Sequence, residues 1–416
     1  MNTRQQTRHL FEAYGLELEY MIVNRNTFDV MPISDWLLSQ VGEPGAREVE
    51  QGSVAWSNEL AMHVIELKGN GPVSHLSTLT NPLKDNIKKM NQLLGEKNAC
   101  LMGSAVHPWM NPDTDTALWL FEDAPIYAAL DKTFGCRGHG WFNLQSAHLN
   151  LPFANDEEFA KLHAAIRIIL PIIPAIAAAS PYLDAKDTGV ADARLLTYAE
   201  HCNRLPEAIG DVIPEPVDNQ QQYEDIILSP LYAALKKREP EGVLQYEWSN
   251  ARGAIARFDR NTIEVRLIDV QEHPGMDMGV VGAVSAAVQL LSDDRRFDWA
   301  ALNAVPTKTL KGILDDTIRQ GEHTLIQRGA YLGAVCDTTS PCTAKEVWQC
   351  LLERCPFFAG PPRQAAEWVV AHGTLASRMR NFVKNTGDEN LKKLAGALCA
   401  SLEKETALFD EEVDAL

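Results

Sequence analysis

The chain has 416 residues, 45% of them hydrophobic and 23% charged, a composition that excludes wholesale disorder and is typical of a globular protein. Its formal net charge of -18 comes from 38 Lys and Arg against 56 Asp and Glu. Such a charge argues against DNA or RNA as a partner, because binding a phosphate backbone requires a basic surface. It does not argue against a small molecule that carries phosphate, since divalent cations can supply positive charge at the site itself.

The sequence predicts no membrane partner and a cytoplasmic location. The N-terminal segment has no apolar core behind its charges, so we expect no secretory signal. The longest apolar stretch, residues 162–179, contains Arg167, Pro171 and Pro174, which a bilayer span of about 20 residues tolerates poorly near its middle. We expect a buried, kinked helix there. None of the eight cysteines forms a Cys-x-x-Cys pair, which favours reduced thiols over a zinc site.

Four strands are predicted from alternating polarity and β-branched content. They lie at residues 13–23, 61–68, 141–151 and 262–270. Between the second and the third, apolar residues at helical spacing predict a helix over residues 82–97. After the third, Asn155 followed by Glu158 resembles a capping box at the start of a long apolar helix. Residues 205–216 are rich in Pro and Gly and predict an ordered loop.

The strand signal fades after about residue 279, where helical patterns take over up to an amphipathic segment at residues 391–408. We therefore expect two regions. Residues 1–300 would form an α+β catalytic domain with a mainly antiparallel β-sheet flanked by helices, and residues 301–416 a helical C-terminal region.

Two glutamates share one face of the first predicted strand. Because side chains alternate along a strand, Glu17 and Glu19 lie on the same side, about 6–7 Å apart, among apolar neighbours. Two like charges in such a setting are unfavourable unless a proton, a base or a cation offsets them. The pattern therefore indicates a metal site, although the same pair could also serve as the acid and base of a metal-free hydrolase.

The other polar positions are less specific when each is taken alone. Glu59 and Glu66 are seven positions apart, so they share a site only if the backbone between them is irregular or helical. His148 lies on the polar face of the third strand, where a hydrogen-bonded core histidine is the alternative. Glu264 and Arg266 share the polar face of the fourth strand. That pair suits a phosphoryl group beside a bound cation, but it could also be a surface ion pair that contributes little.

In order and combination these segments resemble the bacterial and plant-type glutamate–cysteine ligase and carboxylate–amine ligase family, whose catalytic fold is that of glutamine synthetase. The resemblance covers roughly residues 10–295. It is carried by residues 15–20 (Gly-Leu-Glu-Leu-Glu-Tyr), 59–67, 104–109, 145–151, 192–194 with 205–206, and 261–269.

This resemblance implies two clusters of metal ligands. Glu17 and Glu19 would each serve a different cation, with the phosphates of ATP spanning both. Mg²⁺ fits because it favours oxygen ligands and shares them between carboxylates and nucleotide phosphates, and Mn²⁺ would also be tolerated. One implied cluster consists of Glu19, Glu59 and Glu66, and the other of Glu17, His148 and Glu264.

The activity implied is amide formation between a glutamate-like carboxylate and an amine, through an acyl phosphate. The chain has no Gly-x-x-x-x-Gly-Lys-Ser/Thr loop, so cations and arginines would hold the phosphates of ATP. Arg266 and Arg252 would stabilise the developing charge, and Arg194 would hold a substrate carboxylate through bidentate hydrogen bonds. Gln145 and His107 would line the substrate pocket.

One segment departs from the family pattern and leaves the acceptor open. The carboxylate–amine ligase branch reads Trp-Asp-Ile-Arg-Pro before its last strand, whereas residues 248–253 here read Trp-Ser-Asn-Ala-Arg-Gly. Cysteine is therefore one candidate among amines and amino acids. A phosphagen-type kinase and a catalytically silent binding or regulatory protein of the same fold remain as alternatives, and a homodimer is the candidate assembly.

Overall fold

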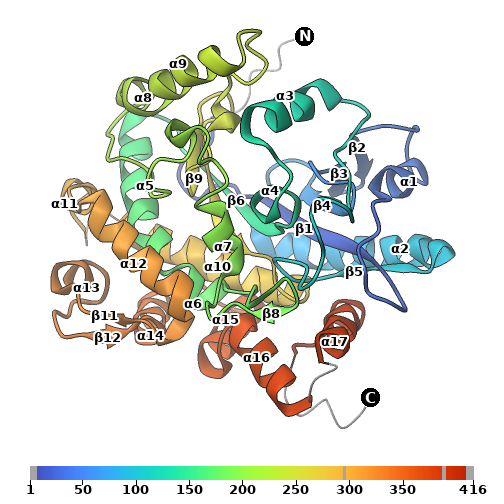
Figure 1. Cartoon of the computed structure of the whole chain (residues 1–416). Helices are drawn as coiled ribbons and strands as arrows, with labels where there is room; N and C mark the ends of the chain where they lie inside the picture. Colours follow the sequence, from blue (N-terminus) through green and yellow to red (C-terminus); the bar gives the residue numbers. More distant parts are fainter. Residues whose placement is uncertain (1–6, 294–296, 387–389, 409–416) are drawn as a thin grey trace.

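The computed structural model describes residues 7–293, 297–386 and 390–408. At its centre lies an antiparallel sheet with the strand order β2-β3-β4-β1-β6-β10-β9, and β5 pairs with the far end of β1 (Figure 1). The strands of this sheet are β1 (Gly15–Asn24), β2 (Glu48–Gln51), β3 (Val54–Asn58), β4 (Val64–Gly69), β5 (Ala99–Met102), β6 (Ser146–Pro152), β9 (Ala254–Arg257) and β10 (Thr262–Asp269). Two small hairpins pair β7 (Tyr182–Leu183) with β8 (Lys186–Asp187) and β11 (Leu325–Ile326) with β12 (Cys342–Thr343).

Helices surround the sheet and dominate the C-terminal third (Figure 1). They are α1 (Ser34–Ser39), α2 (Thr80–Leu94), α3 (Ala124–Phe134), α4 (His139–Phe142), α5 (Asp156–Ile169), α6 (Pro174–Ala177), α7 (Ala193–Tyr198), α8 (Gln220–Tyr223), α9 (Ser229–Arg238), α10 (Pro274–Leu291), α11 (Trp299–Asn303), α12 (Thr307–Gln320), α13 (Gly329–Cys336), α14 (Ala344–Arg354), α15 (Pro361–His372), α16 (Leu375–Thr386) and α17 (Asn390–Lys404). Shorter 3-10 turns lie at Leu76–Leu79, Gly95–Lys97, Leu170–Ile172, Pro206–Ala208, Glu247–Ser249 and Gly321–His323, and a π turn at Glu224–Leu228.

The four predicted strands are confirmed as β1, β4, β6 and β10. The boundaries of the first two differ by one to three residues, and the largest error is in the third: it begins at Ser146 and not at residue 141, because residues 139–142 form helix α4. The side chain of Trp141 packs there on Phe134 of α3, with ring centroids 5.3 Å apart, instead of pairing within the sheet. A preference for packing an aromatic ring has overridden the alternation signal.

Both predicted helices are present, but the start of the second differs in one hydrogen bond from the expected capping box. The helix expected over residues 82–97 appears as α2, followed by a 3-10 turn. The side chain of Asn155 accepts a hydrogen bond from the Glu158 backbone N–H and caps α5. The Glu158 carboxylate accepts from the N–H of Ala154, one residue earlier than a capping box requires.

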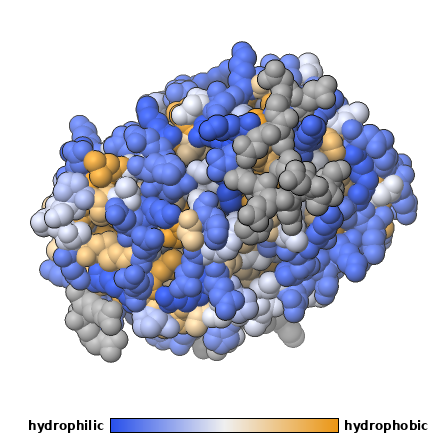
Figure 2. All heavy atoms as spheres, turned by 90° about the horizontal axis from the view of Figure 1, so that it is seen from below, coloured by the Kyte–Doolittle hydropathy of each residue, from blue (hydrophilic) through white to orange (hydrophobic). Residues whose placement is uncertain are grey.

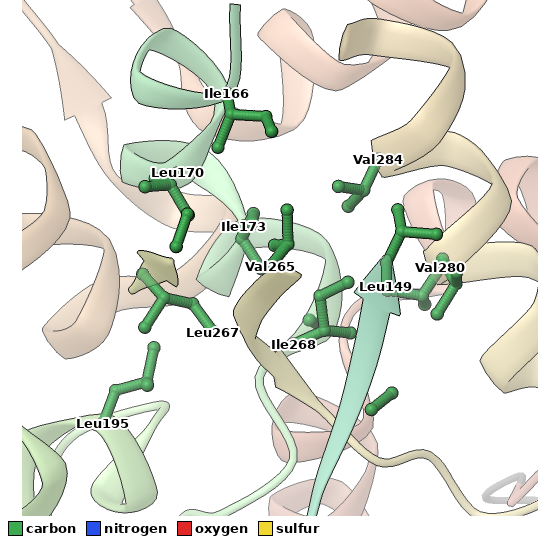
Figure 3. Close-up of a cluster of buried hydrophobic side chains, with 14 of the residues drawn as sticks. Leu149, Ile166, Leu170, Ile173, Leu195, Val265, Leu267, Ile268, Val280 and Val284 are labelled. Atoms are coloured by element: carbon green, nitrogen blue, oxygen red, sulfur yellow. The ribbon is translucent and has the colours of Figure 1, made fainter. Parts of the chain in front are cut away.

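One face of the sheet packs against a helical layer, and this packing leaves the opposite face for polar groups. Leu149 of β6 and Val265 of β10 point toward α5, α6 and α10 (Figure 3). Because strand side chains alternate, the neighbouring residues His148 and Glu264 lie on the other face. The expected kinked apolar run is present as α5, a 3-10 turn and α6, with Pro171 and Pro174 in the turn and at the start of α6.

Among the described residues, one helix is long and apolar enough to cross a bilayer. This helix is α10, with a mean hydropathy of 1.3 over 18 residues. In the structure 89% of that window is buried inside the protein, where α10 packs on α5, α15 and the sheet. The face of the molecule shown in Figure 2 is mainly hydrophilic, with smaller apolar patches between the polar side chains.

Helices α11 to α15 pack on the main hydrophobic core of the sheet, whereas α16 and most of α17 pack on a second apolar cluster together with β1 and β5. A buried ion pair between Arg378 of α16 and Glu272, just after β10, joins the two regions. Arg378 also donates to the carbonyl of Leu408 at 3.2 Å. The division at residue 300 therefore remains a proposal about folding units.

Candidate active site

The strand register brings the predicted polar side chains together on one face of the sheet. In the ladder between β1 and β4, Glu19 pairs with Glu66, and between β1 and β6, Glu17 pairs with His148. Directly paired residues point to the same face, so the three strands present these groups side by side. Glu264 joins them from β10, which pairs with β6 on its other side.

Three of these groups form the tightest cluster. One ligand atom each from Glu17, Glu66 and His148 lies within 4.8 Å of the others. The Nδ1 of His148 donates to Glu17 at 3.1 Å, and the hydroxyl of Ser57 donates to Glu66. Two carboxylates and an imidazole are a donor set that suits a divalent cation such as Mg²⁺ or Mn²⁺. The cluster combines Glu66 from one expected ligand group with two members of the other.

The remaining carboxylates surround this cluster. Glu19 accepts from the backbone N–H of Ser146 at 2.7 Å, and one of its oxygens lies 3.8 Å from the Nε2 of His148. An oxygen of Glu264 lies 3.1 Å from the Nε of Arg266. Both glutamates are buried, so each depends on these contacts for compensation of its charge.

Glu59 reaches the site because the backbone before β4 is irregular. Strand β3 ends at Asn58 and β4 begins at Val64, so the residues between them are free of regular strand geometry. Glu59 lines the same pocket as Glu19. The irregularity that the seven-residue spacing required is therefore present.

The electrostatics of this face show an excess of negative charge. Burial and the neighbouring charge of Glu17 raise the pKa of Glu66 to about 7, and burial with the charges of Glu19 and Glu66 raises the pKa of Glu59 well above its usual range. Burial opposes protonation of His148, yet its hydrogen bond to Glu17 and the charge of Glu19 raise its pKa to about 9. A bound cation would relieve this repulsion.

Two pockets lie along this face, and the two glutamates of β1 border different ones. The first, here called the Glu17 pocket, has a volume of 450 Å³ and is also lined by Lys68 and Arg260. The second, the Glu19 pocket, has a volume of 240 Å³. Glu17 lies in the first set of lining residues and Glu19 in the second. The row of carboxylates thus runs between two cavities.

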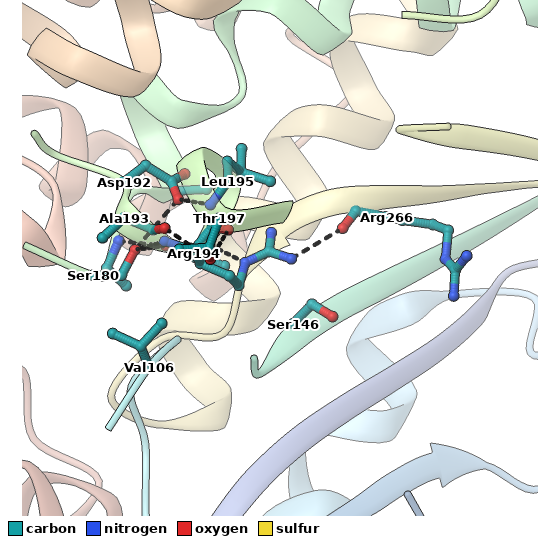
Figure 4. A network of polar contacts seen from close by, with 12 residues as sticks. Val106, Ser146, Ser180, Asp192, Ala193, Arg194, Leu195, Thr197 and Arg266 are labelled. Carbon is teal, nitrogen blue, oxygen red and sulfur yellow. Dashed lines mark hydrogen bonds and ion pairs between the residues drawn. The ribbon is translucent and has the colours of Figure 1, made fainter. Parts of the chain in front are cut away.

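Two predicted arginines line the Glu19 pocket. Arg266 lies beside Glu264, as described. Arg194 is 1% exposed, and Figure 4 shows it in a polar network with Ser180 and Asp192. Its Nε donates to the buried carboxylate of Asp269. Its Nη1 donates to the carbonyl of Arg266 at 3.5 Å, while its buried Nη2 has no hydrogen-bond partner among the described residues. Because Arg194 lines the Glu19 pocket, its guanidinium is the candidate group for an anionic ligand.

Three other predicted residues lie outside the lining of both pockets. Arg252 forms a bidentate ion pair with Glu215, at 2.6 and 2.7 Å. The side chain of Gln145 is fully buried, and its amide atoms have no hydrogen-bond partner among the residues described. The buried His107 donates from Nε2 to the carbonyl of Phe28 at 2.8 Å. These contacts connect Arg252 and His107 to neighbouring loops.

The sequence analysis did not identify several residues of the site. The apolar wall of the Glu19 pocket comes from the helices α3, α4 and α7 and from the 3-10 turn at residues 247–249, for which no catalytic pattern exists. The aromatic content of residues 124–142 was the available signal. Lys68 continues the polar alternation of β4 from Glu66 and could have been found in that way.

Comparison with known proteins places the chain among ligases. The model of a family described as glutamate-cysteine ligase family 2 matches residues 13–316. A protein of Archaeoglobus fulgidus, described as uncharacterized, is 34% identical over 312 residues, which are 75% of this chain and 80% of the relative. A protein of Cupriavidus metallidurans, provisionally named glutamate–cysteine ligase 2, is 22% identical over 387 residues, covering 91% of this chain and 96% of the relative.

A solved structure supports the fold. A glutamate–cysteine ligase of Francisella tularensis in complex with AMP is similar with a TM-score of 0.60 at 12% identity, covering 95% of this chain and 90% of that one. This likeness shows the glutamine synthetase-like α+β fold that the sequence predicted. Because the family match spans most of the catalytic sheet and its helices, the chain belongs to the glutamate–cysteine ligase family 2 and is an ATP-dependent ligase.

Proposed function

We propose that the protein joins a glutamate-like carboxylate to an amine through an acyl phosphate, with ATP as co-substrate. The observation that carries the proposal is the row of carboxylates between two pockets, with Glu17 bordering one and Glu19 the other. Such an arrangement can hold a nucleotide and an acceptor of its phosphoryl group on opposite sides of the same charged groups.

The Glu17 pocket suits the nucleotide. It is the larger of the two cavities on this face, and it is lined by the cationic side chains of Arg47, Lys68 and Arg260. The ammonium group of Lys68 lies 3.6 Å from Glu66, close to the metal-ligating cluster. Cations at this position would compensate phosphate charge in a chain without a glycine-rich phosphate loop.

The Glu19 pocket suits the carboxylate donor. The guanidinium of Arg194 would hold the α-carboxylate of a glutamate-like substrate. Arg266 lies beside Glu264 and would stabilise charge that develops on the transferring phosphoryl group. Arg252, paired with Glu215, would act by fixing the loop before β9.

Divalent cations complete the proposed site. Mg²⁺, or Mn²⁺ in its place, would be held by Glu17, Glu66 and His148, with Glu19, Glu59 and Glu264 as the further ligands that the sequence predicted. When bound, such cations neutralise phosphate charge and orient the reacting groups.

The chemistry balances without a further reactant. A side-chain carboxylate oxygen of the donor attacks the γ-phosphorus, and the bond from that phosphorus to the bridging oxygen of ADP breaks. The amine nitrogen then attacks the acyl carbon, and phosphate leaves with the attacking carboxylate oxygen. Nitrogen loses one proton, and an amide forms.

The dependence of ADP release on each component tests this proposal. We expect release to require a magnesium salt, glutamate and an amine together, with one amide formed per ADP. Release without an amine, accompanied by a stable phosphorylated product, would indicate the phosphagen-type kinase instead. Absence of nucleotide binding would favour the metal-free hydrolase, and absence of any turnover would indicate a silent protein of the same fold.

A further inference from the structure

The polar face of the sheet continues beyond the carboxylate cluster onto the strands β3 and β2. Glu66 of β4 pairs with Ser57 of β3, and Ser57 pairs with Glu48 of β2, so these three side chains share one row of that face. Lys68 lies on the same face of β4, two residues after Glu66, and pairs with Glu17 of β1. The register of the sheet therefore places one lysine beside the cluster and near a carboxylate of β2.

The ammonium group of Lys68 is shared between two carboxylates. Its Nζ lies 2.5 Å from an oxygen of Glu48 and 3.6 Å from the Oε2 of Glu66. The same Oε2 accepts the hydrogen bond from the hydroxyl of Ser57. Glu17 is a further charge neighbour of this ammonium. One oxygen of Glu66, a candidate metal ligand, thus already has a cationic partner that belongs to the protein itself.

The surroundings of Lys68 leave its ammonium room to move. Its side chain is 27% exposed and lines the Glu17 pocket together with Glu48 and Ala55. Ala55 pairs with Lys68 across β3 and carries only a methyl group, so the lysine stem can lie over it and reach β2. A lysine has a flexible four-carbon stem and three rotatable N–H donors. The ammonium can therefore exchange one anionic partner for another within this pocket.

A divalent cation and the ammonium of Lys68 would compete for Glu66. Glu66 belongs to the tightest cluster of candidate ligands, so a cation held there and the ammonium beside it are like charges close together. Glu48 lies outside this cluster and offers the ammonium a position away from the cation. The phosphates of a nucleotide in the Glu17 pocket would offer another position, because they carry negative charge in the pocket that Lys68 lines.

We propose that Lys68 neutralises Glu66 until a divalent cation takes its place, and that its ammonium then moves to Glu48 and to the phosphates of the nucleotide. This inference rests on the proposed function and deepens it, because it links binding of the cation to binding of ATP. Repulsion from a bound cation moves the ammonium away from Glu66 and into the Glu17 pocket. Lys68 then meets the phosphates from the side of β4, and binding of the cation favours binding of ATP.

Binding of Mn²⁺ to the protein without substrates tests the exchange, because it needs no turnover. Electron paramagnetic resonance of free Mn²⁺ gives the dissociation constant for each variant. We expect Lys68→Met to bind Mn²⁺ about tenfold more tightly, since the competing charge is lost while the length of the side chain is kept. Unchanged or weaker binding in Lys68→Met would overturn the inference.

The partner of Lys68 provides a test in the opposite direction. We expect Glu48→Gln to bind Mn²⁺ about tenfold more weakly, because the ammonium of Lys68 then stays at Glu66. Unchanged or tighter binding would overturn the role of Glu48. Lys311→Met is the control, since Lys311 and Asp315 form an ion pair of similar exposure on helix α12, and it should leave Mn²⁺ binding unchanged.

The double variant separates an exchange from a general effect of charge. If Glu48 acts by holding Lys68, Glu48→Gln should change the dissociation constant of Mn²⁺ by less than about twofold in the Lys68→Met background. The same loss of affinity as in the wild-type background would show that the two charges act independently, and it would overturn the exchange.

Titration calorimetry with ATP in the presence of magnesium tests the second half of the inference. We expect Lys68→Met to raise the dissociation constant of ATP about tenfold, although it binds Mn²⁺ more tightly, because the phosphates lose a cationic partner. A misfolded variant would lose affinity for both ligands. An unchanged affinity for ATP would overturn the movement of the ammonium to phosphate.

Failure of the proposed function gives a different set of results. Binding of Mn²⁺ and ATP with the expected changes, but without formation of an acyl phosphate or an amide, would overturn the ligase activity and leave the exchange standing. Amide formation together with unchanged Mn²⁺ binding in Lys68→Met would overturn the exchange alone. Absence of Mn²⁺ binding by the wild-type protein would overturn the exchange and the proposed cation site together.

Discussion

Asp269 lies outside the lining of the Glu19 pocket but fixes the position of Arg194, which lines that pocket. Its fully buried carboxylate accepts hydrogen bonds from the Nε of Arg194, the N–H of Ala179 at 2.7 Å and the hydroxyl of Ser180 at 3.2 Å. These contacts hold one edge of the Arg194 guanidinium, and its Nη1 donates to the carbonyl of Arg266 (Figure 4). Its Nη2 has no hydrogen-bond partner among the described residues. Asp269 is therefore a positioning residue.

We expect Asp269→Asn to raise the KM for glutamate about tenfold or more and to lower kcat less, because a misplaced guanidinium weakens binding of the donor. Steady-state kinetics with varied glutamate measure this split. The control Asp187→Asn removes the partner of a surface arginine, Arg380, and should leave the KM unchanged. A parallel loss of kcat and of thermal stability, with KM unaltered, would assign Asp269 a purely structural role.

Glu264 is the residue whose removal should affect turnover most. It is buried, lies beside Arg266, and faces the cluster of Glu17 and His148. We expect Glu264→Ala to lower ATP turnover by at least about 100-fold with the fold retained, because charge stabilisation at the transferring phosphoryl group is lost. ADP release and circular dichroism measure the two effects. Near-wild-type release would contradict the role, and Glu403→Ala, in a surface pair with Arg25, is the control.

At the scale of elements, the sequence predicted the four strands that carry site residues and missed the four strands of the sheet that have only four or five residues. Strands β1, β4, β6 and β10 alternate between core and site, so their period was visible. Strands β3 and β5 are buried throughout, at five and four residues, and too short to show any period. The predicted 141–145 portion of β6 failed because Trp141 packs on a helix.

Local sequence patterns could predict which residues belong to the site but not how they are grouped in space. Alternation and the family resemblance identified the glutamates and His148, but the closest grouping depends on which strands pair and in what register. The ion pair of Arg252 with Glu215, 37 positions earlier, is a tertiary contact that no local sequence pattern indicates. The apolar wall of the Glu19 pocket comes from separate helices and depends on their packing in the same way.

Helix α5 offers a direct test of a local prediction. The side chain of Asn155 satisfies the N–H of Glu158 at the start of the helix. We expect Asn155→Ala to lower the free energy of unfolding by about 1 kcal/mol, because this N–H loses its partner. Urea denaturation measures the change. Asn26→Ala, at an exposed turn position, should change it by less than about 0.5 kcal/mol, and an equal effect of both would contradict the capping role.

At the scale of the whole molecule, the C-terminal helices support the catalytic sheet. Arg378 of α16 is 5% exposed and pairs with Glu272, which is fully buried where β10 leads into α10. Burial would raise the pKa of the Glu272 carboxyl, but the charge and hydrogen bonds of Arg378 lower it below its usual range. The charge of Glu272 in the core therefore depends on a residue more than 100 positions away.

We expect Arg378→Ala to destabilise the protein by about 3–5 kcal/mol, because it leaves a buried carboxylate without its partner. Arg380 lies on the same helix, in an ion pair with Asp187 that is partly exposed, and Arg380→Ala should cost less than about 1 kcal/mol. Chemical denaturation of both variants gives the comparison. Similar small effects would show that α16 contributes little to the stability of the sheet.

The central claim is that the carboxylate face of the sheet activates a substrate carboxylate by phosphorylation. Glutamate labelled with ¹⁸O in its side-chain carboxylate, incubated with the protein, ATP, magnesium and hydroxylamine, tests this claim through the mass of the released phosphate. The account predicts one ¹⁸O atom in each phosphate formed along with the hydroxamate. Unlabelled phosphate released at the same rate as ADP would contradict it, because the oxygen would then have come from water.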